Sequence, residues 1–231
     1  MHIDDKMLGL VFKIIASVLL ASFFMHGSVN CGYTRDLLCQ PLDIVFVIDR
    51  SGSVRDSNPA PCLLDTPCDN WFLMRSFIAD LIRNITPGRD TRFGAVVFGS
   101  DKNTSTHVVF ALTSDRRAAT SHVMNLPYRP HHTATYRGLR LMRQQVFSQS
   151  GDRGDVRNVA IVITDGEPTQ YEGGGTFDRN VTQATADAVE EAELAKEVGI
   201  VILALGVTSS VNNDTIIALA SDGIGVSRPV R

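Results

Sequence analysis

The hydrophobic pattern alternates between strand-like and helix-like segments from residue 41 onward. Near-continuous apolar runs, typical of strands covered on both faces, occupy residues 42–48, 93–98, 159–164 and 200–205. Apolar residues at helical spacing lie between these runs, over residues 71–85, 116–124, 136–147, 181–198 and 216–220. This order predicts an α/β domain with a doubly wound, Rossmann-like, mostly parallel sheet and helices on both faces.

One further strand is expected to run against the others. Residues 106–112 follow the strand at 93–98 after too few residues for a parallel crossover, which needs a dozen or more. The two segments are therefore predicted to form a hairpin, with the second strand antiparallel at an edge of the sheet.

The amino terminus has the pattern of a secretory signal peptide, assigned to residues 1–27. Lys6 and Lys13 precede an apolar run, 14–25, that is too short to span a bilayer comfortably. An uncleaved anchor remains the alternative. Residues 28–40 would then form a cysteine-bearing leader, and residues 41–231 a single domain.

Cysteines and glycosylation motifs agree with an extracellular protein. Four cysteines allow three full pairings, of which Cys62–Cys68 is the expected pair because these two bracket a short loop, and Cys31–Cys39 is the second. Neither spacing is typical of a zinc site. N-glycosylation sequons begin at Asn84, Asn103, Asn180 and Asn213.

Composition bounds the function only loosely. The chain has 231 residues, 44% of them hydrophobic, and a formal charge of -3. This length supports one domain with a full core, and the near-neutral charge argues against a broad nucleic-acid surface.

Polar side chains follow two of the predicted strands directly. Asp49, Ser51 and Ser53 come after the first strand, and Asp165 comes after the strand at 159–164. In a doubly wound sheet such positions meet outside the carboxyl ends of the strands, and the loop that carries Thr133 opens on the same edge. Carboxylates and hydroxyls are oxygen ligands, which a small hard cation prefers.

These residues resemble the metal-ion-dependent adhesion site (MIDAS) of the von Willebrand factor type A (vWA) domain. The D-x-S-x-S motif lies at Asp49, Ser51 and Ser53, the T-x-T motif at Thr133 and the T-D-G motif at Asp165, in the family's order. The resemblance covers about residues 41–221, and the run 41–49 is similar to the matrilin and collagen VI group of the extracellular matrix.

The resemblance implies a function as well as a fold. The five residues would hold Mg²⁺, or Mn²⁺ or Ca²⁺, and leave one position for a Glu or Asp carboxylate of a partner protein. We therefore expect a secreted, non-catalytic adhesion or extracellular-matrix protein whose partner is collagen or another matrix protein. Neither nucleic-acid binding nor a stable membrane span is expected.

The carboxyl end departs from the family pattern. Few residues follow Ser221, so the sheet is expected to lack its last edge strand and closing helix. An exposed sheet edge would permit self-association.

Two other functions are compatible with the sequence. A structural matrix module with a silent metal site fits the same sequence. A metal-dependent hydrolase would need a general base, for which His131 and His132 are the candidates, but no G-x-S-x-G or phosphate loop accompanies them.

Two smaller features add expectations of their own. Arg50, inside the metal motif, is expected to favour acidic partners. Arg153-Gly154-Asp155 matches an adhesive tripeptide, although Gly-Asp is also ordinary turn chemistry.

Overall fold

The computed structural model describes residues 41–56, 70–85, 90–100, 105–129, 132–148, 151–164, 167–175, 178–207, 212–221 and 226–227. The predicted signal peptide and leader lie outside the described residues. So do Cys31, Cys39, Cys62, Cys68, Asn103, His131 and Asp165.

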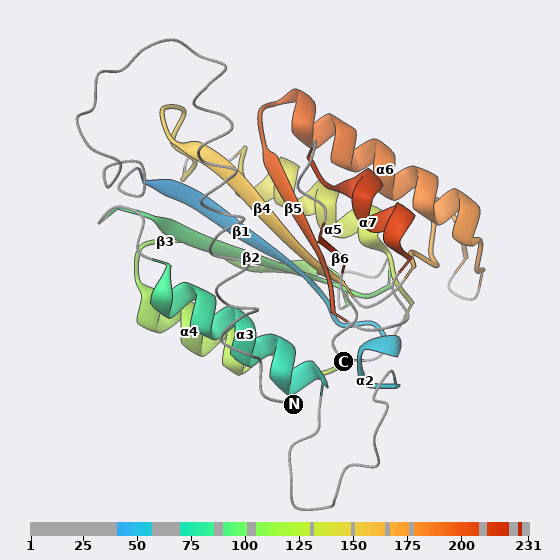
Figure 1. Ribbon diagram of the computed structural model, residues 1–231, viewed down its shortest axis with the longest axis horizontal. Coiled ribbons are helices and arrows are strands. Elements are labelled where there is room, and N and C mark those ends of the chain that lie inside the picture. The colour runs from blue at the N-terminus through green and yellow to red at the C-terminus, as the bar shows by residue number, and fades with distance from the viewer. Residues whose placement is uncertain are drawn as a thin grey trace, which may run out of the picture.

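Strands and helices alternate as the apolar pattern predicts (Figure 1). The strands are β1 (Leu42–Asp49), β2 (Arg92–Phe98), β3 (His107–Thr113), β4 (Arg157–Thr164), β5 (Val201–Gly206) and β6 (Val226–Ser227). The helices are α2 (Ser53–Asp56), α3 (Asn70–Asn84), α4 (Arg116–Met124), α5 (Thr135–Leu141), α6 (Val181–Glu197) and α7 (Asn213–Leu219), with a π turn, η2, at Met142–Val146.

The strands form one sheet in the order β3-β2-β1-β4-β5-β6. All neighbouring pairs are parallel except β2–β3, which is antiparallel, so the predicted hairpin and fold class are confirmed. The last edge strand is present but reduced to two residues, β6, which corrects the expectation that it is missing. Within the described part of the chain, no helix follows it.

The chain winds in two directions from β1, the strand at the switch point. β2 lies on one side of β1 and β4 on the other. Helices α3 and α4 cover one face of the sheet, and α5, α6 and α7 cover the other (Figure 1). The carboxyl ends of β1 and β4 therefore open together at one edge of the sheet, as a doubly wound sheet requires.

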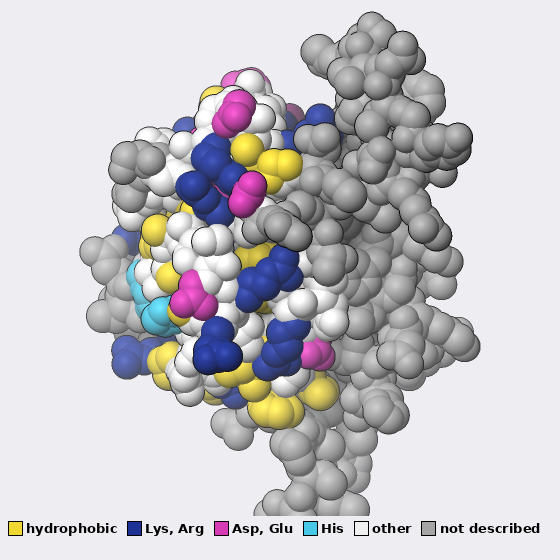
Figure 2. Space-filling view, turned by 90° about the vertical axis from the view of Figure 1, so that its left-hand side faces the viewer, with side chains coloured by type: hydrophobic (Ala, Val, Ile, Leu, Met, Phe, Trp, Pro, Cys, Tyr) yellow, Lys and Arg dark blue, Asp and Glu magenta, His cyan; other side chains and the backbone are white. Residues whose placement is uncertain are grey.

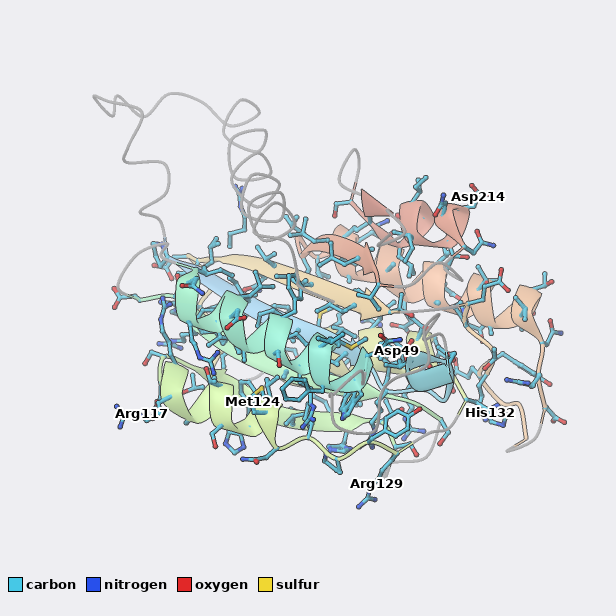
Figure 3. The ribbon with its side chains drawn as sticks, turned by 60° about the horizontal axis from the view of Figure 1, so that its bottom comes forward. Asp49, Arg117, Met124, Arg129, His132 and Asp214 are labelled. Atoms are coloured by element: carbon cyan, nitrogen blue, oxygen red, sulfur yellow. The ribbon has the colours of Figure 1, made fainter. Side chains whose placement is uncertain are left out.

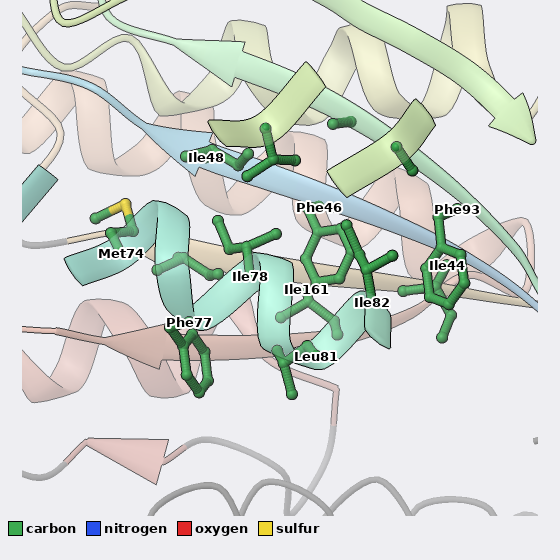
Figure 4. Close-up of a cluster of buried hydrophobic side chains, with 14 of the residues drawn as sticks. Ile44, Phe46, Ile48, Met74, Phe77, Ile78, Leu81, Ile82, Phe93 and Ile161 are labelled. Atoms are coloured by element: carbon green, nitrogen blue, oxygen red, sulfur yellow. The ribbon is translucent and has the colours of Figure 1, made fainter. Parts of the chain in front are cut away.

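Alternating residues of β1 supply both hydrophobic cores. Ile44, Phe46 and Ile48 point into the cluster formed with α3 (Figure 4), whereas Val45 and Val47 pack with α5 and α6. A period of two along a strand places successive side chains on opposite faces. Burial on both faces explains why this strand is a continuous apolar run.

The helix predicted over 136–147 is interrupted by the π turn. Phe147 donates its amide to the carbonyl of Met142 at 3.0 Å, a bond across five residues instead of four. The wider turn keeps Met142, Val146 and Phe147 buried together. Apolar spacing alone predicts a helix here but does not resolve one wider turn.

Gly138 allows α5 to approach β2 closely. A Cβ atom added at this position would lie 2.8–3.0 Å from the side chain of Phe98, which is fully buried. A methyl group therefore fits only if the aromatic ring or the helix moves.

The Gly138→Ala substitution is expected to lower the free energy of unfolding by about 1–3 kcal/mol, because overpacking outweighs the higher helix propensity of Ala. Urea unfolding followed by circular dichroism measures the change. Gly154→Ala is the matched control, since nothing lies within 4 Å of the added Cβ there. Equal stability of the two variants would contradict the close approach.

Candidate metal centre

Asp49 ends β1 with a fully buried carboxylate. Its Oδ1 accepts a hydrogen bond from the backbone amide of Ser51 at 2.8 Å, and its Oδ2 accepts one from the hydroxyl of Thr164 at 2.6 Å. Thr164 is the last residue of β4, so one side chain bridges the two strands at the switch point. These bonds fix both carboxylate oxygens.

The two serines of the motif lie close together on the loop after β1. The hydroxyl oxygens of Ser51 and Ser53 are 3.0 Å apart. Ser51 is buried, whereas Ser53, at the start of α2, is exposed. The loop thus turns two neutral oxygens toward each other beside a buried carboxylate.

Tyr128 supports this loop from the segment after α4. Its hydroxyl donates to the carbonyl of Gly52 at 2.9 Å and to that of Ser51 at 3.3 Å. Its ring packs against Trp71 with the centroids 6.0 Å apart, and the indole N–H of Trp71 donates to the carbonyl of Leu126. The start of α3 therefore helps to position the metal loop.

Thr133 is buried and held on both sides of its backbone. Its amide donates to the hydroxyl of Thr169 at 3.0 Å, and its carbonyl accepts from the amides of Thr169 at 3.0 Å and Gln170 at 3.3 Å. The next amide, of Ala134, donates to the carbonyl of Gly99 at 2.6 Å. The segment after β4 and the end of β2 thus both fix the threonine loop.

Glu172 is an exposed residue that anchors the segment after β4. Arg140 of α5 donates to both of its carboxylate oxygens, at 2.5 and 2.7 Å, and also to Glu191 of α6 at 2.6 Å. The hydrogen bonds with Glu172 raise the pKa of Arg140 and lower the pKa of Glu172. Paired, directional charges of this kind hold a loop more firmly than single contacts do.

The candidate ligands that the structure describes have the chemistry that a hard divalent cation prefers. Asp49, Ser51, Ser53 and Thr133 offer carboxylate and hydroxyl oxygens, the ligand chemistry of Mg²⁺, and the fifth predicted ligand, Asp165, lies outside the described residues. Within the described ranges, no three His, Cys, Asp or Glu side chains form a metal-binding group. Three of the five predicted ligands are hydroxyls and only two are carboxylates, so the predicted site would not form a group of three such side chains.

Arg50 is not exposed to a partner protein, so the expectation that it favours acidic partners is wrong. Its side chain is fully buried, and its Nε donates to the carbonyl of Ser105 at 3.0 Å. Burial, and then the charge of Arg129, lower the pKa of Arg50 to about 10. Arg50 thus ties the metal loop to the start of the β3 hairpin.

Basic side chains nevertheless lie at this end of the molecule. Figure 3 shows Arg129 and His132 toward the same end as Asp49 and α2. Arg129 is exposed and His132 is half-buried.

The arginine of the Arg-Gly-Asp tripeptide forms hydrogen bonds with a residue of β1. Arg153 donates to both carboxylate oxygens of Asp43, at 2.5 and 3.2 Å, and Asp43 is fully buried at the start of β1. These hydrogen bonds raise the pKa of Arg153. The arginine of the tripeptide is therefore engaged in a partly buried ion pair.

Three of the predicted glycosylation sites are described and exposed. Asn84 ends α3, Asn180 caps α6, and Asn213 begins α7. The side chain of Asn180 accepts a hydrogen bond from the amide of Gln183, so it also stabilises the helix start.

The sequence motifs did not identify Thr164, Tyr128 or Thr169 as parts of this site. Thr164 is the first residue of the T-D-G motif, which was the available signal. Tyr128 and Thr169 lie in irregular segments whose approach to the metal loop depends on the tertiary fold. Separately, in the part of the chain that the structure describes, none of the helices combines the length and apolarity needed to cross a bilayer.

Two proteins of known sequence are similar to part of this chain. It is 28% identical to the human collagen alpha-6(VI) chain over 178 residues, 72% of this chain and 6% of that one. It is 31% identical to mouse matrilin-3 over 138 residues, 56% of this chain and 25% of that one. The chain therefore spans a quarter or less of the length of these relatives.

Solved structures share the fold. Proximal thread matrix protein 1 from the mussel byssus matches with a TM-score of 0.60 and 25% identity, covering 80% of this chain and 40% of that one. A form of that protein with a zinc-occupied MIDAS motif gives 0.60 at 21% identity, covering 79% and 42%. Manganese-loaded TRAP protein of Plasmodium vivax gives 0.58 at 21%, covering 78% and 62%.

The family model of the von Willebrand factor type A domain matches residues 43–227, from the start of β1 to β6. This match covers all of the described residues except 41 and 42, and it agrees with the order of the strands and with the motif after β1. The chain belongs to the von Willebrand factor type A domain family.

Proposed function

We propose that this protein is a secreted, non-catalytic adhesion or matrix protein that binds a partner protein through a divalent cation at the carboxyl edge of its sheet. The observation that carries the proposal is the buried Asp49 carboxylate, fixed by Thr164 and Ser51 beside two paired serine hydroxyls. The proposed ligands are Asp49, Ser51, Ser53, Thr133 and Asp165, and the proposed ion is Mg²⁺, with Mn²⁺ or Ca²⁺ as substitutes.

The donor set explains why such an ion would bind a partner. Three of the five proposed ligands are neutral hydroxyls, so the two aspartates would leave the bound ion able to attract a further anionic oxygen. A Glu or Asp side chain of the partner supplies that oxygen. The protein's own part is to hold the hydroxyls and the carboxylates in place, which the bonds from Tyr128 and Thr169 favour.

The relatives support a matrix setting. A collagen chain, a matrilin and a byssal matrix protein all contain a region similar to this chain. We therefore propose collagen or another matrix protein as the partner. The signal peptide over 1–27 and the leader over 28–40 belong to the same proposal.

Calorimetric titration with Mg²⁺ or Mn²⁺ is expected to show one binding site in the wild-type protein. Asp49→Asn keeps the shape of the side chain but removes its charge, and should weaken binding at least about tenfold. Asp155→Asn is the matched control, because this exposed aspartate lies with the Arg153 loop near the start of β1. Absence of binding heat in the wild type would favour the structural module with a silent site.

Binding to surface-immobilised collagen tests the partner separately. Binding should require Mg²⁺ or Mn²⁺, disappear with EDTA and be lost in Asp49→Asn, since the bridge between the proteins runs through the ion. If collagen binding persists after both treatments, cation-dependent adhesion is wrong. If the metal binds but collagen does not, only the partner is wrong.

Tyr128→Phe is expected to weaken cation binding about two- to tenfold, because it removes the hydroxyl that holds the carbonyls of Ser51 and Gly52. The ring contact with Trp71 remains, so the free energy of unfolding should change by less than about 1.5 kcal/mol. Calorimetry and urea unfolding measure the two effects. Unchanged metal affinity would show that the metal loop does not depend on Tyr128.

A further inference from the structure

The connection between β4 and α6 leads from the candidate metal centre to the helices on one face of the sheet. It begins at the predicted ligand Asp165 and ends at Asn180, the residue that caps α6. Its described residues, 167–175 and 178–180, contain no helix or strand. Long connections with little regular structure are usually functional in compact domains.

Near its beginning, the connection holds the threonine loop. The carbonyl of Thr133 accepts hydrogen bonds from the amides of Thr169 at 3.0 Å and Gln170 at 3.3 Å. The amide of Thr133 donates to the hydroxyl of Thr169 at 3.0 Å. A shift of residues 169–170 would therefore move the backbone of Thr133, and with it the hydroxyl that is proposed to bind the cation.

Glu172 fastens the same connection to both neighbouring helices. Its carboxylate accepts from Arg140 of α5 at 2.5 and 2.7 Å, and its backbone amide donates to Asp187 of α6 at 2.7 Å. Gln183, one turn earlier on α6, donates to the other oxygen of Asp187 at 2.7 Å and so orients that carboxylate. Among the described residues, the other hydrogen bonds of residues 171–175 stay within the connection itself.

Arg140 is already ordered on the side away from Glu172. Its Nε donates to Glu191 at 2.6 Å, and Glu191 is buried and also accepts from Arg143 at 2.6 Å. The guanidinium of Arg140 lies over the ring of Tyr136, 5.5 Å from its centroid. An exposed ion pair usually contributes little, because two long side chains must be ordered to form it. Here one of the two is held by other contacts and the pair is bidentate, which are the conditions under which such a pair is effective.

We propose that the ion pair of Arg140 and Glu172 positions Thr133 for the cation, so that both are positioning residues of the metal centre. This inference rests on the proposed cation site and adds two residues that lie outside the sequence motif. The pair restrains the backbone at residue 172, and the hydrogen bonds of residues 169–170 pass the restraint to Thr133. Without the pair, part of the population would hold Thr133 elsewhere, and the cation would bind more weakly.

Two variants remove the pair and change the charge in opposite directions. Glu172→Ala removes an exposed carboxylate, whereas Arg140→Met keeps the aliphatic part of the side chain and removes the guanidinium. If charge alone mattered, the first variant would weaken Mg²⁺ binding and the second would strengthen it. Lost positioning weakens binding in both.

Glu193→Ala is the matched control. Glu193 forms an ion pair with Lys196 at 2.8 Å, and its side chain is 56% exposed, close to the 59% of Glu172. The pair lies in the last turns of α6, which runs away from the carboxyl edge of the sheet toward the end of the molecule that faces the viewer in Figure 2. Acidic and basic side chains lie side by side at that end. The control thus breaks a similar pair at a distance from the metal loop.

Calorimetry with Mg²⁺ on the full-length protein should give a dissociation constant about two- to fivefold higher in Glu172→Ala and Arg140→Met, and within about 1.5-fold of the wild type in the control. The double variant should bind like the single ones, because both changes remove the same interaction.

Hydrogen exchange without metal measures the restraint itself. The amides of Thr169 and Gln170 should exchange about threefold faster or more in both variants, while the amides of β1 exchange as in the wild type.

The outcomes separate failure of this inference from failure of the cation site. Unchanged Mg²⁺ affinity in both variants, or affinities that shift in opposite directions, would overturn the inference and leave the cation site intact. Exchange that quickens equally in β1 and at residues 169–170 would also overturn it, because the ion pair would then only stabilise the domain as a whole. A wild-type protein that binds no Mg²⁺ would overturn the cation site itself, and this inference with it.

Discussion

The hydrogen bond from Thr164 to Asp49 joins the carboxyl ends of the two strands at which the chain reverses its winding. A fully buried carboxylate requires polar partners, and Asp49 obtains them from Thr164 on β4 and from the amide of Ser51 on its own loop. The register of β1 against β4 sets this contact, because Ile48 lies opposite Ile163 and the two strand ends therefore coincide. The position of the candidate metal ligands follows from that one pairing.

The remaining contacts of the site come from elements far apart in sequence. Tyr128 holds the carbonyls of the serine loop, Thr169 holds the backbone of Thr133, and Arg50 fixes the loop to the β3 hairpin. In each case the bond joins side chain and backbone, so it restrains the path of a loop that has no regular structure. These hydrogen bonds hold the loops, and with them the candidate ligand oxygens, in fixed positions. A metal site whose ligands are mostly neutral hydroxyls needs ligands that are positioned before the ion binds.

Much of this architecture could be predicted from the residue pattern. The continuous apolar runs of β1 and β4, the helical spacing of α3 and α6, and the short link to β3 each reflect local physics, and all are confirmed. The wider turn at Met142–Val146 was not predicted, because the buried residues Leu139, Met142 and Val146 keep the spacing of an ordinary α-helix. The burial of Arg50 was predicted wrongly, since a charged residue after a strand is normally solvated. The pairing of Arg153 with Asp43 depends on two segments 110 residues apart and has no local signal.

The proposed metal centre places Asp49, Ser51, Ser53 and Thr133 around a divalent cation together with Asp165. Mn²⁺ tests it directly, because this paramagnetic ion broadens the NMR signals of nearby amides. At substoichiometric Mn²⁺, the amide signals of Ser51, Ser53 and Thr133 should disappear first, while that of Asn158, at the opposite end of β4 from Thr164, persists. Uniform broadening, or broadening centred on another part of the molecule, would contradict the claim.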